Sequence, residues 1–143
     1  MGGIDSNRGL GVVVAARELR QVGSHRVVTV KLGTPRRAAR GEYWECPYQI
    51  VGLGSRQMQR ANGEDGVQAL LLAIESVRTA LKKSGKQFSW VGGEPGDTGF
   101  TPIVPTFFGR RFAKRLELMI EREVDRFARS IEKRHRRRRT ANR

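Results

Sequence analysis

Alternating apolar and polar residues near the start of the chain predict a β-hairpin. Residues 12–22 are apolar and then mixed, and in residues 26–32 Val28, Val30 and Leu32 alternate with Val27, Thr29 and Lys31. A period of two is typical of a strand with one buried face. The turn-forming segment 23–25 separates the two strands, which favours a hairpin. The apolar positions that we expect on the buried face of the second strand are Val28, Val30 and Leu32.

A third strand is expected over residues 43–53, where aromatic and aliphatic side chains again alternate. Pro47 lies near the middle of this segment and has no backbone N–H to donate to a neighbouring strand. We therefore expect the strand at an edge of the sheet, or with a bulge near Pro47. One face of the strand carries Trp44, Cys46, Tyr48 and Ile50, and the other face carries Tyr43, Glu45, Gln49 and Val51.

The clearest helical period of the chain lies in residues 62–85. Asp65, followed three residues later by Gln68, is typical of a capping box at a helix N-terminus. Gly85 is typical of the position just past a helix end. The apolar residues with helical spacing, which predict the buried face, are Val67, Leu70, Leu71, Ile74, Val77 and Leu81.

After this helix we expect a short strand over residues 88–91 and then a loop rich in glycine and proline over residues 92–105. A second helix is expected from about Thr106. Its apolar residues are Phe108, Phe112, Leu116, Met119, Ile120, Val124, Phe127 and Ile131. Residues 136–143 continue without large apolar side chains, so we expect this end to fray unless a partner binds it.

The expected order β-β-β-α-β-α predicts the α+β class, as an antiparallel β-meander with two helices packed on one face. The expected organisation is a flexible leader over residues 1–11, a single α+β domain over residues 12–132 and a basic C-terminal tail over residues 133–143. A length of 143 residues suits one such domain.

The composition excludes several classes of protein. Cys46 is the only cysteine, so an intrachain disulfide cannot form and a cysteine-based zinc site lacks ligands. A single cysteine fits a reducing compartment. We expect no export signal and no membrane span, because the longest purely apolar runs are only about five residues. The predicted location is the cytoplasm.

Positive charge accumulates at the C-terminus. The chain holds 28 Lys and Arg residues against 14 acidic residues, a net charge of +14. Residues 129–143 contribute eight of the basic residues against one acid, Glu132. A terminal cluster of this kind is typical of segments that bind polyanions. The residues that we predict to contact nucleic acid here are Arg129, Lys133, Arg134, Arg136, Arg137, Arg138 and Arg139.

A second basic patch, Arg36, Arg37 and Arg40, lies between the second and third expected strands and is a further candidate for nucleic-acid contact. The alternative for the C-terminal cluster is structural. Basic residues complement the dipole at a helix C-terminus, and Asp125 with Arg129 or Glu132 with Arg136 have the spacing of surface ion pairs.

No spacing of His, Cys, Asp or Glu matches a known catalytic set, so we predict no catalytic residue, no metal site and no cofactor, and the sequence favours a binding protein over an enzyme. Cys46 is expected in the core, as are Trp44 and Tyr48, whereas Tyr43 is the better surface aromatic. The loop carboxylates Glu94 and Asp97 favour paired tight turns over a cation site. An enzyme would need Cys46, Glu94, Asp97 and a His in one pocket.

Three segments resemble a family of small uncharacterised bacterial domains: Cys46-Pro47-Tyr48-Gln49-Ile50, Gly66-Val67-Gln68-Ala69-Leu70-Leu71-Leu72-Ala73-Ile74 and Trp90-Val91-Gly92-Gly93. The resemblance covers roughly residues 15–105. It implies a bacterial cytoplasmic setting but no reaction or ligand, so it assigns no functional residue.

The leading hypothesis is a non-enzymatic domain whose basic C-terminal helix and tail bind a polyanion, most plausibly nucleic acid. The alternative is a protein-interaction module of the immunity or adaptor type, in which the tail serves solubility or meets an acidic partner protein. A homodimer formed through the second helix is compatible with either hypothesis, because the apolar stripe of that helix exceeds what one small sheet must cover.

Overall fold

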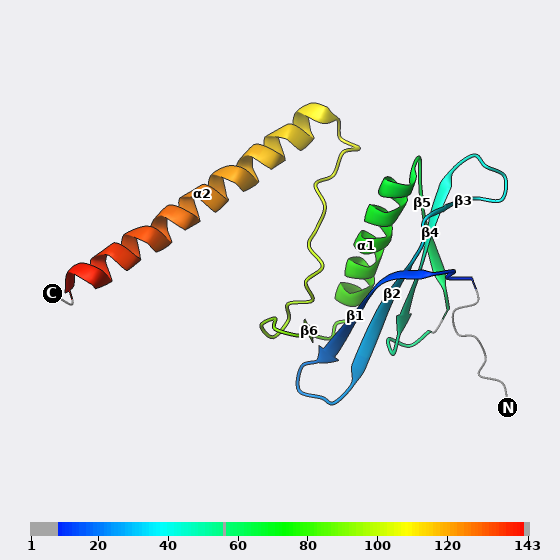
Figure 1. The fold of residues 1–143 in the computed structure, drawn as a ribbon, viewed down its shortest axis with the longest axis horizontal. Coiled ribbons are helices and arrows are strands. Elements are labelled where there is room, and N and C mark those ends of the chain that lie inside the picture. The colour runs from blue at the N-terminus through cyan, green and yellow to red at the C-terminus, as the bar shows by residue number, and fades with distance from the viewer. Residues whose placement is uncertain (1–8, 56, 142–143) are drawn as a thin grey trace. The chain divides into compact units, whose positions relative to one another are not determined.

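A computed structural model describes residues 9–55 and 57–141 of the chain. The chain divides into two compact units, Met1–Pro102 and Ile103–Arg143, which are described separately below. The predicted α+β class is confirmed (Figure 1). The expected domain over residues 12–132 thus spans parts of both units. Of the expected leader, residues 1–8 lie outside the described residues, and Leu10 is buried.

The first unit is built on a six-stranded antiparallel sheet with the order β3-β4-β2-β1-β6, in which β5 also pairs with β4. The strands are β1 (Val13–Gln21), β2 (Val27–Gly33), β3 (Arg36–Arg37), β4 (Trp44–Val51), β5 (Gln59–Gly63) and β6 (Phe88–Trp90). The predicted hairpin is confirmed, since β1 pairs with β2 in a register that places Leu19 opposite Val28. Val28, Val30 and Leu32 are buried in the core, as their alternation predicts.

The expectation of an edge position for the third predicted strand is wrong. This strand, β4, pairs with β5 along one side and with β2 and β3 along the other. Pro47 is tolerated because it lies between two ladders on one side of β4. Along that side, β3 pairs with Trp44 and Glu45, and β2 pairs with Tyr48 and the residues that follow it. A residue without an N–H therefore occupies a position where that side of the strand has no partner.

Helix α1 (Gly66–Lys83) begins and ends as its sequence predicts. The Asp65 side chain accepts a hydrogen bond of 2.8 Å from the backbone N–H of Gln68. The Gln68 side chain in turn accepts one of 2.6 Å from the backbone N–H of Glu64. The first bond satisfies a donor that the first turn of a helix leaves free, and the second fixes the chain just before the N-cap residue.

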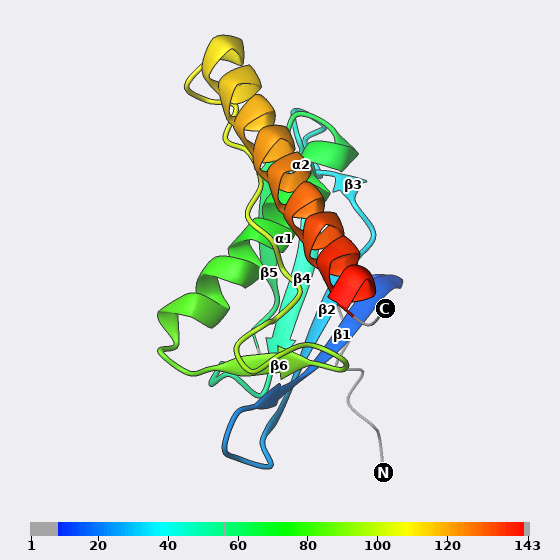
Figure 2. The ribbon, with the colours of Figure 1, turned by 90° about the vertical axis from the view of Figure 1, so that its left-hand side faces the viewer.

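Most of the predicted apolar face of α1 is confirmed, since Val77 and Leu81 are buried in the core and Leu70 and Ile74 pack against it. Val67 and Leu71 are the exceptions, with 69% and 44% of their surfaces exposed. The fully buried residues are Ala69, Ala73, Val77 and Leu81, a stripe with a spacing of four. Helix α1 packs on β4 and β5 (Figures 1 and 2). Small residues on this face let the helix backbone approach the strands closely, and a Cβ at Gly63 would lie 2.5 Å from the backbone nitrogen of Ala69.

The second unit consists of residues 103–109 followed by helix α2 (Arg110–Ala141). The helix continues through residues 136–141, where we expected the chain to fray, and residues 142–143 lie outside the described residues. Within the described part of the chain, no helix has the length and apolarity that crossing a membrane requires.

The close contact between α1 and the sheet predicts a large effect of substituting Ala73. We expect Ala73→Leu to lower the free energy of unfolding by about 1–3 kcal/mol, because three additional carbon atoms enter a packed interface. Urea unfolding measures this change. The control is Val67→Ala on the exposed side of α1, which should change the same free energy by less than about 0.5 kcal/mol. Equal effects of the two substitutions would contradict the assigned buried face.

Candidate nucleic-acid interface

Helix α2 carries most of the excess charge of the protein. Residues 103–143 contain 14 Lys and Arg residues and 5 acidic residues, so this unit contributes +9 of the total charge of +14. The first turn of α2 contains no acid, and the last turn contains Arg138 and Arg139. Cations at a helix C-terminus interact favourably with the dipole, whereas cations in the first turn do not.

One side of α2 carries a continuous row of cations. Successive residues in an α-helix are rotated by about 100° around the axis, so residues with suitable spacing share one face. Six exposed cations fall within an arc of about 60° on this basis. We call this set the basic stripe: Arg111, Arg115, Arg122, Arg126, Arg129 and Lys133.

The last two turns of α2 carry cations on every side. Arg134 and Arg136 to Arg139, which we call the basic end, point around the whole circumference and are all exposed. In the described part of the chain, no residue of the basic end and neither Arg129 nor Lys133 forms an ion pair. The side chain of Arg134 instead donates a hydrogen bond to the Ser130 hydroxyl at 3.3 Å. The cations predicted for the C-terminus therefore remain available to an external anion.

The ion pairs on α2 differ from those that the spacing suggested. Arg126 pairs with Glu123 at 2.6 Å, and this hydrogen bond raises the pKa of Arg126 above its usual value. Lys114 approaches Glu117 at 3.8 Å. Both pairs are exposed, and exposed pairs contribute little to stability. Among the described residues, neither Asp125 with Arg129 nor Glu132 with Arg136 is an ion pair.

The predicted patch at Arg36, Arg37 and Arg40 belongs to the first unit, and two of its three members have structural roles. Arg36 donates to Glu45 at 3.0 Å across the β3–β4 pair, and to the backbone oxygen of Gly9. The guanidinium of Arg37 lies 5.8 Å from the centre of the Trp44 ring. Arg40 is exposed in a turn. Arg40 is therefore the only member of this patch without an interaction within the described residues.

Four of the six members of the basic stripe were not predicted from the sequence: Arg111, Arg115, Arg122 and Arg126. Arg111 and Arg115 belong to a short run of four cations in residues 110–115, whereas Arg122 and Arg126 alternate with acidic residues, so a search for the densest charge cluster passes over them in favour of residues 129–143. The signal that identifies them is the helical spacing of four and seven residues, which places them on one face.

The residues considered for other chemistry have structural roles. Cys46 is buried, its thiol lies 3.5 Å from the Gly33 carbonyl oxygen, and burial raises the pKa of the thiol, which disfavours the reactive thiolate. Tyr48 is buried, and its hydroxyl lies 2.7 Å from the side-chain oxygen of Gln59. Trp44 packs against the core, as expected. Within residues 9–55 and 57–141, no group of three or more His, Cys, Asp or Glu side chains could hold a metal ion.

Comparison with known proteins identifies the first unit. A family model described as Domain of unknown function (DUF6968) matches residues 15–102, more than half of the chain. The match confirms the resemblance to an uncharacterised domain family. No curated protein and no solved structure matches the chain significantly. The match ends at the last residue of the first unit, so α2 lies outside it.

Proposed function

We propose that this chain, which belongs to the DUF6968 family, binds nucleic acid through helix α2 without catalysing a reaction. The observation that carries the proposal is the combination of the basic stripe and the basic end on one helix, with Arg126 as the only ion-paired member among the described residues. A row of unpaired cations is the electrostatic footprint expected of a protein that neutralises phosphates.

The geometry of α2 suits a long polyanion. A helix of 32 residues is about 48 Å long at 1.5 Å per residue. Over that length a nucleic-acid duplex presents many phosphates, spaced by about 1.7 Å along its axis when both strands are counted. Cations spread along the helix contact several phosphates at once, whereas a compact anion could engage only a few of them. Arginine in particular forms bidentate hydrogen bonds with phosphate.

Such binding is governed by charge and is independent of base sequence. Beyond Phe127 the described residues of α2 include no Phe, Tyr or Trp, so stacking at the basic end is limited to His135 and the arginine guanidinium groups, and charge dominates the contact. We propose a bacterial cytoplasmic setting, where nucleic acid is abundant and a single free cysteine stays reduced.

The salt dependence of binding tests this proposal. With about five phosphate contacts, the slope of log K against log salt concentration for duplex DNA should lie near −4 to −5. Replacing Arg136 to Arg139 with Ala should reduce the magnitude of this slope by about 3 to 4, because each lost contact removes about 0.9. Alanine preserves the helix. Fluorescence anisotropy with a labelled duplex measures both slopes.

The matched control removes four exposed cations from the first unit: Arg20, Arg26, Lys83 and Lys86, each replaced by Gln. This variant has the same net charge as the variant of the basic end, and its slope should change by less than about 1. Equal losses in both variants would show that net charge alone causes the binding. No change in the anisotropy of the labelled duplex at low ionic strength would refute the proposal.

Co-purification with and without nuclease distinguishes a nucleic-acid partner from an acidic protein.

A second candidate function, protein interaction, is favoured by the opposite side of α2. Five apolar residues, which we call the apolar stripe, fall within an arc of about 80°: Leu116, Ile120, Val124, Phe127 and Ile131. Ile120, Val124 and Phe127 are more than half exposed. Exposed apolar rows of this kind mark interaction surfaces.

The partner that best fits the apolar stripe is a second copy of α2. Leu116 and Phe127, like Ile120 and Ile131, are eleven residues apart, and an eleven-residue apolar repeat is typical of helices that pack along one another. Acidic residues border both sides of the stripe: Glu117 and Glu121 on one side and Glu123 on the other. The charges at the two borders therefore do not choose between a parallel and an antiparallel pair.

Self-association predicts different results for two glutamate substitutions. Ile120→Glu should convert a dimer into a monomer in sedimentation equilibrium, because it places a charge at the centre of the apolar stripe. Leu118→Glu is the matched control, since Leu118 lies about 160° away around the helix. The variant Ile131→Cys reports the orientation of the pair. Under mild oxidation, a disulfide between the two introduced cysteines forms in a parallel pair and does not form in an antiparallel pair. A monomeric wild-type chain, or equal behaviour of the two glutamate variants, would contradict the pairing.

A further inference from the structure

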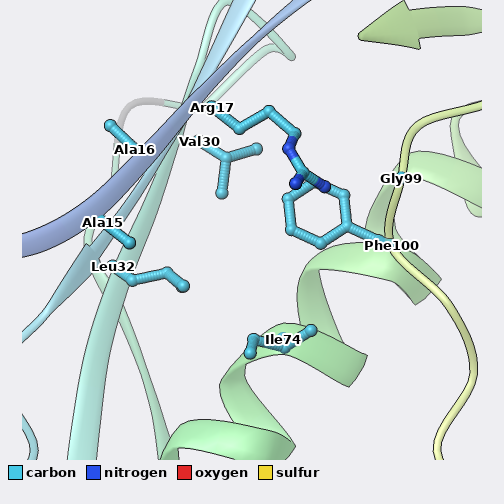
Figure 3. A pocket seen from close by; sticks show the side chains of 8 residues that line it. All are labelled: Ala15, Ala16, Arg17, Val30, Leu32, Ile74, Gly99 and Phe100. Atoms are coloured by element: carbon cyan, nitrogen blue, oxygen red, sulfur yellow. The ribbon is translucent and has the colours of Figure 1, made fainter. Parts of the chain in front are cut away.

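A small pocket opens on the face of the sheet that packs against α1. Helix α1 packs on β4 and β5, and beside it the face of β1 and β2 forms a cavity of about 270 Å³. Ala15, Val30 and Leu32 line it from the sheet, Ile74 lines it from α1, and Arg17 and Phe100 lie at its rim (Figure 3). All of these residues belong to the first unit, and most of the lining is apolar.

Arg17 occupies a position where the strand pattern favours an apolar residue. It pairs with Val30 across β1 and β2, as Leu19 pairs with Val28, so its side chain projects from the same face of the sheet as these core residues. The guanidinium lies 4.7 Å from the centre of the Phe100 ring and 5.5 Å from that of Trp90. It donates one hydrogen bond, from Nη1 to the backbone oxygen of Thr98 at 3.2 Å.

The loop around residue 97 is shaped to hold this guanidinium. Gly99 has a φ of +69°, and a Cβ at this position would lie 2.6 Å from Nη1 of Arg17. The loop also contains the carboxylate of Asp97, two residues before Gly99, but this group stabilises the loop. It accepts hydrogen bonds from the backbone N–H of Gly99 at 2.8 Å and from the Trp90 indole at 3.2 Å. The paired turns expected here are closed by backbone hydrogen bonds from Gly93 N–H to Trp90 O at 3.0 Å and from Asp97 N–H to Glu94 O at 2.9 Å.

Arg17 therefore lacks a counter-ion. Within the parts of the chain that the structure describes, no carboxylate oxygen lies within 4.0 Å of its guanidinium, although the residue is half-buried. A partly desolvated cation is costly unless an anion or several hydrogen-bond acceptors satisfy it. Arg17 has five N–H donors and uses one of them for Thr98, so donors remain for an oxyanion.

We propose that this pocket binds a small carboxylate with an apolar tail. The carboxylate accepts hydrogen bonds from the free N–H groups of Arg17, and the tail lies against Val30, Leu32 and Ile74. Both ends of such a ligand match the pocket: a single cation at the rim and an apolar floor. This site is separate from α2 and does not depend on the binding of nucleic acid.

Octanoate is a suitable probe of the full-length chain. Isothermal titration calorimetry should show saturable binding of octanoate, and the methyl resonances of Ile74 should shift with the same affinity in NMR spectra. Octan-1-ol and octylammonium, which keep the tail and lack the carboxylate, should bind at least tenfold more weakly, since a hydrogen bond to a charged group contributes about 1.5–3 kcal/mol.

Two variants separate recognition of the carboxylate from simple apolar binding. Arg17→Met keeps an unbranched side chain about as long as the aliphatic part of arginine and removes the guanidinium, so octanoate should bind it at least tenfold more weakly while octan-1-ol binding stays unchanged. Ile74→Trp fills the pocket from α1 and should abolish binding while Arg17 remains. Equal affinity of octanoate for the wild-type chain and Arg17→Met would overturn the proposal. Absence of saturable octanoate binding to the wild-type chain would overturn it as well.

Discussion

Repulsion among the cations of α2 is the physical constraint on which the rest of this account depends. Fourteen basic residues against five acidic ones in residues 103–143 leave a helix whose basic stripe and basic end are almost unpaired within the described residues. Like charges one turn apart destabilise a helix by a few tenths of a kcal/mol per pair. The opposite side of the same helix exposes its apolar stripe to water. An anion bound along the basic stripe would reduce the repulsion among the cations. A second copy of α2 against the apolar stripe would remove those side chains from water.

The two proposed associations would be coupled. A parallel pair of α2 helices would bring two basic ends together, which would cost electrostatic energy until a polyanion lay between them. Under the proposal, binding of nucleic acid would favour the pair, and by linkage the pair would bind nucleic acid more tightly. The first unit is less charged: it contains the whole family match, a core covered by α1, and a pocket with a single cation. The proposed polyanion site thus lies in the part of the chain that the family model does not cover.

Local patterns predicted much of the fold. Alternation identified the β1–β2 hairpin, and the capping residues identified the start of α1, because both depend on residues close in sequence. The buried face of α1 was predicted in part: Val77 and Leu81 are buried as expected, but Ala69 and Ala73 were not predicted, because large aliphatic residues were favoured where close approach to the strands requires small ones. The position of Pro47 depends on where two separate ladders end, which one strand's sequence does not encode.

The candidate sites were predictable to different degrees. The C-terminal cations follow directly from composition, and the rest of the basic stripe follows once helical spacing is applied to the whole of α2. The pocket at Arg17 could not be predicted, since it depends on a contact with Thr98, 81 residues away in the sequence. Interactions of this range appear only when the loop after β6 is placed against β1.

Hydrogen exchange of the full-length chain with and without duplex DNA tests the central claim most directly. At low salt, DNA should slow exchange of backbone amides throughout α2 and leave the amides of β1 to β6 and α1 unchanged, because among the described residues it is α2 that carries a row of cations with few ion pairs. Slower exchange confined to the sheet or to α1, or no change anywhere in α2, would contradict the account.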